Sequence, residues 1–209
     1  MSANYIQLTQ INVLPNKMDE VVESWHKMFG NDKKNYELYF SYHDDKESIL
    51  IITNLKDSPE LFLEKANKKE EILGKIINSC LISDWRRQIL KLEDSVKPLE
   101  IDLPASPFLQ LRYIEVPICV YEQYLDWRKD TIFHHVKCQK DIDFFLSYHS
   151  VMSTEPGVMF LSGFSCAPEE YLSLFKTPKY YQIVKEAGDK YIAGGEKGLY
   201  TKLYKRSHC

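Results

Sequence analysis

The segments YIQLTQINV (residues 5–13) and FLQLRYIEV (108–116) decide the fold, because they place the same strand pattern at the start of each half of the chain. A second pair of segments, LYFSYH (38–43) and FFLSYH (144–149), recurs in the same order and ends in the same tripeptide. Segments that recur in one order along a chain indicate an internal repeat. We therefore expect two copies of one structural unit.

The first half of the chain shows two periodicities. Its β-rich runs are separated by turn residues, and apolar residues recur at every third or fourth position between Lys17 and Phe29, which predicts strands and an amphipathic helix. Ser58-Pro59 places a proline at the start of a second helix. The elements are predicted at 5–13, 17–29, 37–43, 48–55, 59–80 and 85–93. Their order, β-α-β-β-α-β, is that of a ferredoxin-like unit.

The second half repeats this order after a segment without periodicity. Residues 96–107 are rich in proline, which is typical of a linker. The later elements are predicted at 108–116, 120–132, 144–149, 157–164, 168–191 and 198–206. We therefore predict an α+β fold in which two tandem ferredoxin-like units, residues 1–95 and 108–209, form an α+β barrel. Whether they pair with each other as an internal pseudo-dimer or across a homodimer stays open.

The composition narrows the class of protein. Hydrophobic residues make up 44% of the 209 residues, enough for a globular core, and a net charge of −3 gives no electrostatic basis for binding nucleic acid or an anionic membrane. No apolar run is long enough for a membrane span and the N-terminus has no signal-peptide pattern, so we expect a cytoplasmic protein. The five cysteines form no C-x-x-C motif, which argues against a disulfide framework and a zinc site.

The two first strands share an alternation that bears on a binding site. One set of alternating positions is apolar in both, namely Ile6, Leu8, Leu109 and Leu111. The other set is mixed, namely Gln7, Thr9, Gln110 and Arg112. Alternate residues of a strand face opposite sides of the sheet, and the helices of a ferredoxin-like unit cover one side. We expect the helices to cover the apolar set, so that the two mixed faces meet and enclose a cavity with polar residues.

Two longer stretches resemble a known family. INVLPNKMDEVVESWHKMF (11–29) and LFKTPKYYQIVKEAGDKYIAGGEKGLYTKLYK (174–205) are similar to the antibiotic biosynthesis monooxygenase (ABM) group of the dimeric α+β barrel superfamily, here as a tandem. The resemblance implies a small-molecule enzyme that oxygenates or cyclises an aromatic or phenolic substrate in a barrel pocket without a cofactor. Two alternatives stay open: a haem-binding protein resembling the two-domain chlorite dismutase relatives, and a non-catalytic ligand-binding or assembly protein.

Candidate site residues follow from the repeat and from the strand register. His43 and His149 end the matched Ser-Tyr-His tripeptides, where an imidazole could act as general base on a phenol. A structural hydrogen bond to the hairpin turn is the alternative role. Arg112 could hold an anionic oxygen of the substrate or pair with an acidic residue. The residues expected to orient the substrate are Gln7, Thr9, Tyr42, Gln110 and Tyr148.

The haem alternative requires an axial ligand. His134 and His135, which end the first helix of the second half, are the residues considered for it, together with His149. The helices predicted at 59–80 and 168–191 correspond to the one that carries the proximal histidine in the haem-degrading relatives, and neither contains a histidine. That departure counts against haem degradation, and no metal site is predicted.

Overall fold

The computed structural model of the chain describes residues 2–30, 35–42, 47–56 and 59–207. The first half contains β1 (Tyr5–Asn12), α1 (Met18–Phe29), β2 (Tyr36–Ser41), β3 (Ser48–Lys56), α2 (Pro59–Ile77), a 3-10 turn (Asn78–Cys80) and β4 (Arg86–Lys97). The second half contains β5 (Phe108–Ile114), a 3-10 turn (Ile118–Val120), α3 (Tyr121–Arg128), a π-helical turn (Lys129–Phe133), α4 (His134–Lys137), β6 (Phe144–Met152), β7 (Val158–Phe164), α5 (Pro168–Ser173), α6 (Pro178–Lys190), a 3-10 turn (Gly195–Gly198) and β8 (Leu199–Arg206).

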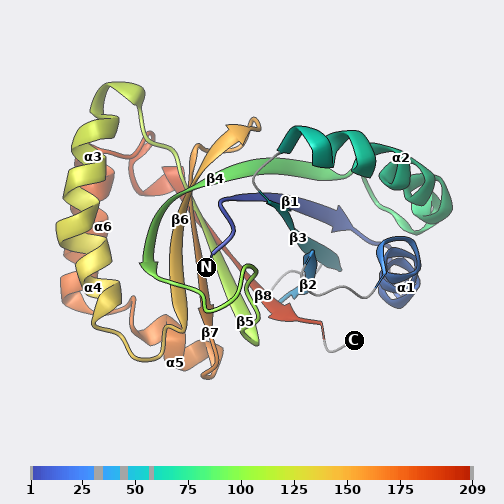
Figure 1. Cartoon of the computed structure of the whole chain (residues 1–209). Helices are drawn as coiled ribbons and strands as arrows, with labels where there is room; N and C mark the ends of the chain where they lie inside the picture. The colour runs from blue at the N-terminus through green and yellow to red at the C-terminus, as the bar shows by residue number, and fades with distance from the viewer. Residues whose placement is uncertain (1, 31–34, 43–46, 57–58, 208–209) are drawn as a thin grey trace.

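The strands form one closed barrel (Figure 1). Around it the order is β1-β3-β2-β8-β5-β7-β6-β4, and the neighbouring strands pair antiparallel. The first half contributes β4-β1-β3-β2 and the second contributes β8-β5-β7-β6, so the internal order of the two halves is the same. The predicted α+β barrel is confirmed, and the two halves close it within a single chain.

Two seams of unequal length join the halves. The pairing of β4 with β6 is long and contains register shifts, whereas β2 pairs with β8 over a short stretch at the end of β2. At the short seam, the guanidinium of Arg206 donates two hydrogen bonds, of 3.0 and 2.7 Å, to the carboxylate of Glu37. A bidentate pair of this kind fixes the relative position of the two strands.

The barrel interior is filled by apolar side chains from both halves. Ile6, Leu8, Leu109 and Leu111 all belong to this interior cluster. The apolar set of strand positions therefore points inward and the mixed set points outward to the helices, so the predicted orientation is wrong. The inner face of a closed barrel is buried on every side and a polar group there finds few partners. The helices outside, in contrast, supply hydrogen-bonding side chains.

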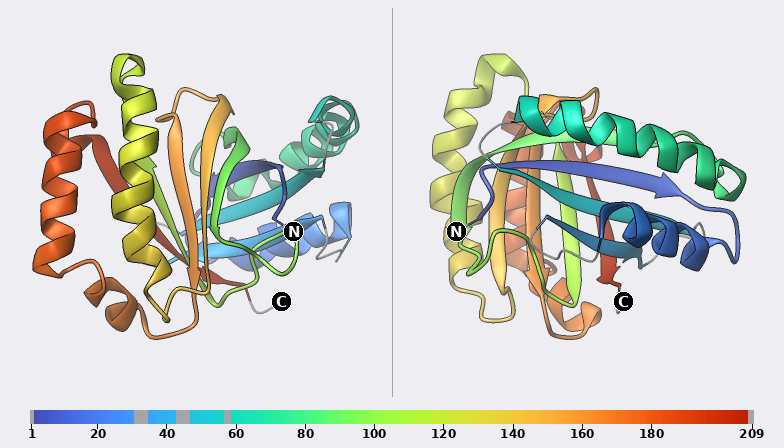
Figure 2. Two further views of the ribbon diagram at one scale, coloured as in Figure 1. Left: turned by 60° about the vertical axis from the view of Figure 1, so that its left-hand side comes forward. Right: turned by 45° about the vertical axis from the view of Figure 1, so that its right-hand side comes forward.

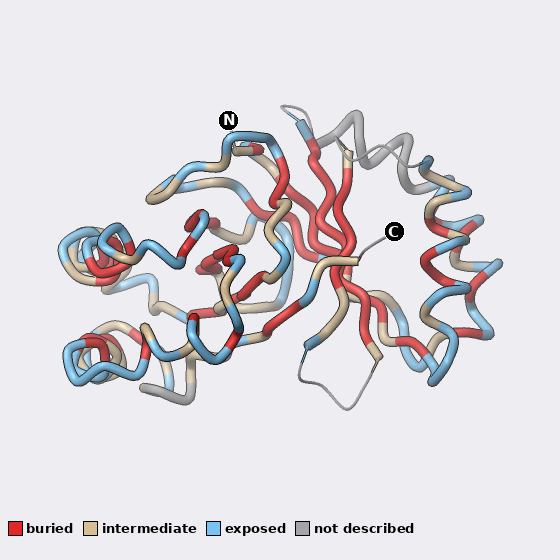
Figure 3. The backbone as a smooth tube through the Cα atoms, turned by 90° about the horizontal axis from the view of Figure 1, so that it is seen from below, coloured by how far each residue is buried: buried red, intermediate tan, exposed pale blue. Residues whose placement is uncertain are grey.

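Helices flank the barrel on two sides (Figures 1 and 2). The first half packs its helices through a cluster that includes Ile11, Val22, Trp25, Ile51 and Leu73. The second half does so through a cluster that includes Ile114, Phe133, Phe160, Tyr171 and Ile183. Figure 3 shows the buried residues along the central strands and along the helix faces turned toward them. Among the described residues, no helix has both the length and the apolar character needed to cross a membrane.

The segment predicted as a linker has a structural role. Its first residues extend β4 to Lys97, and residues 98–107 lie across the end of the barrel where β1 begins. Leu103 is 2% exposed and belongs to the interior cluster, and the backbone N–H of Ala3 donates to the carbonyl oxygen of Asp102 at 3.0 Å. This segment, residues 98–107, therefore covers one end of the barrel.

Candidate functional site

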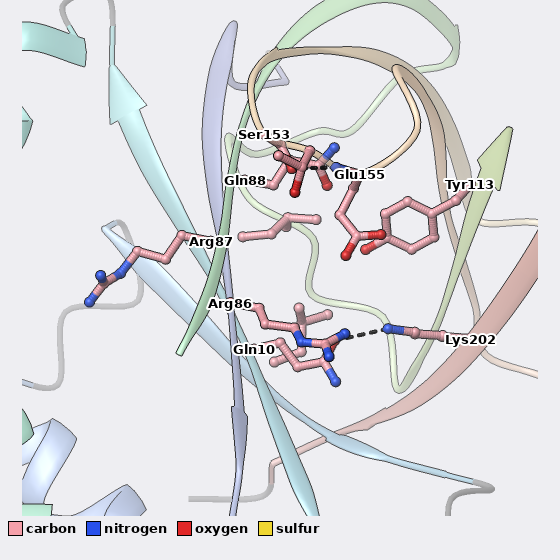
Figure 4. A pocket seen from close by; sticks show the side chains of 11 residues that line it. Gln10, Arg86, Arg87, Gln88, Tyr113, Ser153, Glu155 and Lys202 are labelled. Atoms are coloured by element: carbon pink, nitrogen blue, oxygen red, sulfur yellow. Dashed lines mark hydrogen bonds between the residues drawn. The ribbon is translucent and has the colours of Figure 1, made fainter. Parts of the chain in front are cut away.

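A polar cavity of about 380 Å³ opens at the opposite end of the barrel, where β1 ends (Figure 4). We call this cavity the barrel mouth. Both halves of the chain contribute to its lining: Leu8, Gln10, Leu50, Arg86, Arg87, Gln88, Tyr113, Ser153, Thr154, Glu155 and Lys202. Leu8 and Leu50 belong to the interior cluster, so the mouth is a polar opening above an apolar floor.

One wall of the mouth is β4. Arg86 and Gln88 share the inward face of this strand, opposite Gln10 and Leu8 of β1. Arg87 lies between them and points away from the cavity (Figure 4), where its Nη2 is 2.9 Å from the Glu70 carboxylate of α2. Strand alternation therefore selects Arg86 and Gln88 for the mouth.

The facing wall combines aromatic rings with a lysine. Tyr113 of β5 stacks on Tyr200 of β8, with ring centroids 4.7 Å apart and an interplanar angle of 13°. The Nζ atom of Lys202 lies 5.7 Å from the Tyr113 ring centroid and 5.8 Å from that of Tyr200. It also donates a hydrogen bond of 3.0 Å to Oε1 of Gln10. The ammonium is thereby held over two rings and beside an amide, on the side of the mouth opposite Arg86.

The β6–β7 turn borders the mouth with a carboxylate. The hydroxyl of Tyr200 donates to Oε2 of Glu155 at 2.5 Å, and the backbone N–H of Glu155 donates to Oγ of Ser153 at 2.9 Å. Burial, together with the Glu155 charge, raises the pKa of Tyr113 and of Tyr200 above the ordinary value for a phenol. Both tyrosines are therefore neutral hydrogen-bond donors at physiological pH.

Gln88 is an unsatisfied donor in this site. Its side chain is 4% exposed, and within the described part of the chain its Nε2 atom has no hydrogen-bond partner. A buried donor without an acceptor costs about 1–3 kcal/mol, a cost that a ligand oxygen placed there would remove. Arg86 and Lys202 both extend into the mouth, so the mouth suits a small molecule with an anionic oxygen.

The residues predicted as catalytic are not brought together here. His149 faces outward from β6, with its ring edge-on to Tyr121 of α3 at 5.3 Å and Nδ1 3.0 Å from the backbone oxygen of Ser150. Arg112 also faces outward, and its guanidinium donates to the hydroxyl of Tyr180 on α6. Neither lines the mouth, because both belong to the outward-facing strand positions. His43 lies outside the described residues.

The predicted substrate-orienting residues of the first strands also have partners outside the barrel. Nε2 of Gln7 donates to Oγ1 of Thr9 at 3.1 Å and to the Glu70 carboxylate at 3.3 Å. The Oε1 atom of Gln110 accepts a hydrogen bond of 3.1 Å from the hydroxyl of Tyr171 on α5. These amides tie the sheet to the helices that cover it.

The two predicted tyrosines have different positions. Tyr148 faces the barrel interior as expected, but its hydroxyl donates to the carbonyl oxygen of Ala3 at 3.1 Å, away from the mouth. Tyr42 is 36% exposed and its ring meets Phe108 edge-on at 5.6 Å. Neither residue lines the mouth.

Sequence reasoning missed the polar residues of the mouth, although a signal for them was present. The alternation of β1 continues from Ile6 and Leu8 to Gln10, and that of β8 runs through Tyr200 and Lys202. Once the apolar positions are known to face inward, following them to the end of each strand leads to these side chains.

Comparisons with known proteins identify solved structures with a similar fold. No protein-family model and no curated protein sequence matches the chain. A structure described as a candidate monooxygenase from Fusobacterium nucleatum is 9% identical, with 98% of this chain and 93% of that one covered and a TM-score of 0.69. An anthrone oxidase-like protein is 12% identical, with 98% and 91% covered and a TM-score of 0.65. A haem-binding protein from Thermus thermophilus is 11% identical, with 98% and 91% covered and a TM-score of 0.62.

At these identities the likeness shows a shared α+β barrel fold, and residue roles have to come from this chain. Haem is the cofactor that the comparison suggests, so we tested whether the residues present fit it. The described lining of the mouth contains no histidine. Haem iron needs an axial side chain from the protein, most often a histidine. A bare metal ion is a separate case, and the described residues contain no group of three or more His, Cys, Asp and Glu side chains placed to hold one.

The histidines considered as axial ligands do not provide a haem site either. His134 is exposed. His135 is buried, which lowers the pKa of its imidazole, and its ring lies 5.1 Å from that of Tyr180. The gap beside Tyr180, between β5 and α6, has a volume of about 10 Å³, whereas ligand pockets have volumes of roughly 300–1,000 Å³. Haem does not fit the described residues as they are arranged, and we derive no step through it.

Proposed function

We propose that the chain is a small-molecule enzyme of the monooxygenase type, which holds an aromatic phenol or enol in the barrel mouth and requires no cofactor. The observation that carries this proposal is the cavity of about 380 Å³ with Arg86 and Lys202 on facing walls. A volume in this range accommodates a ligand of two or three fused rings. The apolar floor of the barrel and the ring of Tyr113 provide surfaces for its rings.

The chemistry in the mouth would begin with loss of a proton from the substrate. Glu155, at the edge of the cavity, is the carboxylate placed to accept that proton. The unpaired Nε2 donor of Gln88 is placed to bind the oxygen of the resulting phenolate or enolate, and the positive charges of Arg86 and Lys202 stabilise that anion from across the cavity. The anion is electron-rich enough to react with O2 itself. When a ring methylene becomes a carbonyl, the carbon gives up four electrons to O2. One oxygen atom enters the product and the other leaves as water with the two methylene hydrogens.

The assignment to an ABM-like tandem is part of the same proposal. The resemblance of residues 11–29 and 174–205 to that family supports it, and so does the common strand order of the two halves. In this interpretation residues 1–95 and 108–209 are two ferredoxin-like units. The anthrone oxidase-like neighbour suggests the class of substrate to try first.

Oxygen consumption with anthrone, measured against a protein-free blank, tests the proposal. Lys202→Gln should lower kcat/KM at least about tenfold, since a unit charge roughly 7–8 Å from an oxyanion contributes about 2 kcal/mol at an effective dielectric constant of about 20. Lys205→Gln is the matched control, because Lys205 lies on the same strand and is exposed, and it should leave the rate within about twofold. Equal rates in the two variants would place the chemistry elsewhere. Ligand binding without oxygen uptake would favour the non-catalytic alternative.

A further inference from the structure

The two cations of the mouth have different surroundings. Lys202 is held by Gln10 and by two aromatic rings, as described above. Arg86 is exposed and points across the cavity toward Lys202 (Figure 4). Among the described residues, the carboxylate that pairs with a β4 arginine in this region is Glu70, and it pairs with the outward-facing Arg87. The guanidinium of Arg86 is therefore available to a ligand on the cavity side.

A single phenolate oxygen is a poor match for two cations that lie on facing walls of the cavity. A guanidinium presents two parallel N–H groups, a geometry that matches the two oxygens of a carboxylate. A carboxylate between Arg86 and Lys202 would accept hydrogen bonds from both walls at once. The cation pair thus fits a carboxylate better than a single oxygen atom.

The other end of the mouth fits a phenolic or enolic oxygen. Gln88 lies two residues from Arg86 on the same face of β4, which separates their Cα atoms by about 7 Å. In Figure 4 its amide lies beside Ser153 and Glu155, away from the Arg86–Lys202 pair. The Nε2 donor of Gln88 has no protein acceptor among the described residues, and Glu155 lies close by to take a proton.

We propose that the ligand of the barrel mouth is an aromatic hydroxy acid, with its carboxylate between Arg86 and Lys202 and its hydroxyl oxygen at Gln88. This inference rests on the proposed function for the location of the site and adds the class of ligand. A fused two-ring acid with its hydroxyl and carboxylate at opposite ends spans such a distance. The probe that we choose is 6-hydroxy-2-naphthoate, with 2-naphthol as the analogue that lacks the carboxylate.

Isothermal titration of the full chain with the two probes tests the inference. 6-Hydroxy-2-naphthoate should bind about ten- to a hundredfold more tightly than 2-naphthol, as expected for charge-assisted hydrogen bonds. Arg86→Gln should remove most of this preference, because it weakens the binding of 6-hydroxy-2-naphthoate far more than the binding of 2-naphthol. Lys91→Gln removes an exposed cation from the same strand and should keep the preference. That control separates a specific contact from general attraction between a basic surface and an anion.

The outcomes distinguish this inference from the function on which it rests. Equal affinity of the original chain for both probes would overturn the carboxylate assignment and leave a phenol site intact. Retention of the full preference in Arg86→Gln would also overturn it. If neither probe binds, the location of the site in the mouth is wrong, and the proposed function fails together with the ligand class.

Discussion

Truncation of Leu103 tests whether residues 98–107 close the barrel or merely connect its halves. Leu103 is 2% exposed and packs within the interior cluster, and its neighbour Pro104 accepts a hydrogen bond of 3.1 Å from Tyr39 through its carbonyl oxygen. Leu→Ala at a buried site costs about 3–5 kcal/mol, depending on how far the surroundings collapse. Because Leu103 lies at the end of the barrel on an irregular segment that can relax, we expect the lower limit, about 3 kcal/mol.

The assay is urea unfolding followed by tryptophan fluorescence, with Ile101→Ala as the control. Ile101 lies two residues away and is 54% exposed, so its truncation should change the free energy of unfolding by less than about 0.5 kcal/mol. With an m-value near 2.5 kcal/mol/M, Leu103→Ala should lower the midpoint by about 1 M urea. Equal midpoints for the two variants would refute the view that this segment completes the core.

Three further predictions follow from the packing and the titratable groups. Gly163→Ala should destabilise the fold strongly, because the added Cβ would lie 2.0 Å from Cε1 of Phe144. Gly74→Ala should be neutral or stabilising by up to about 1 kcal/mol, because its added Cβ would lie 3.9 Å from the nearest atom. Thermal unfolding of both variants checks the contrast. Burial lowers the pKa of His135, so the unfolded chain binds more protons than the folded one below the ordinary histidine pKa of about 6.5. Stability should therefore fall as the pH drops from 7 toward 5, and less steeply in His135→Gln than in His134→Gln, as measured by unfolding at each pH. Titration with haemin should give no saturable Soret band at one haem per chain, whereas a band that one histidine substitution abolishes would show that the chain holds haem through that histidine.

Periodicity predicted the elements because each half of the chain contains strands with β-rich apolar runs and helices with apolar residues at every third or fourth position. The strands and the hairpins are found close to the predicted positions, and the helix predicted at 168–191 is divided into α5 and α6. The helix predicted at 120–132 instead contains a π-helical turn, Lys129–Phe133, and continues to Lys137. The π-helical turn shifts Phe133 and Val136 out of phase with the preceding residues, so a search at the α-helical period ends too early.

The site was harder to predict, because alternation shows which residues share a face and not which face is inside. Gln7 and Arg112 look like residues of a polar cavity in the sequence, yet their partners are Glu70 and Tyr180 on helices that are distant along the chain. Because these polar side chains contact the helices, the apolar residues that alternate with them face the barrel interior. The mouth then consists of the last residues of the inward rows, which no single strand identifies alone.

The most direct test of the account is a crystal structure of the chain with bound 6-hydroxy-2-naphthoate. Ligand density should lie in the barrel mouth, with the carboxylate between Arg86 and Lys202 and the hydroxyl oxygen within hydrogen-bond distance of Nε2 of Gln88. Density between β5 and α6 beside Arg112, or on the outer surface with the mouth empty, would contradict it.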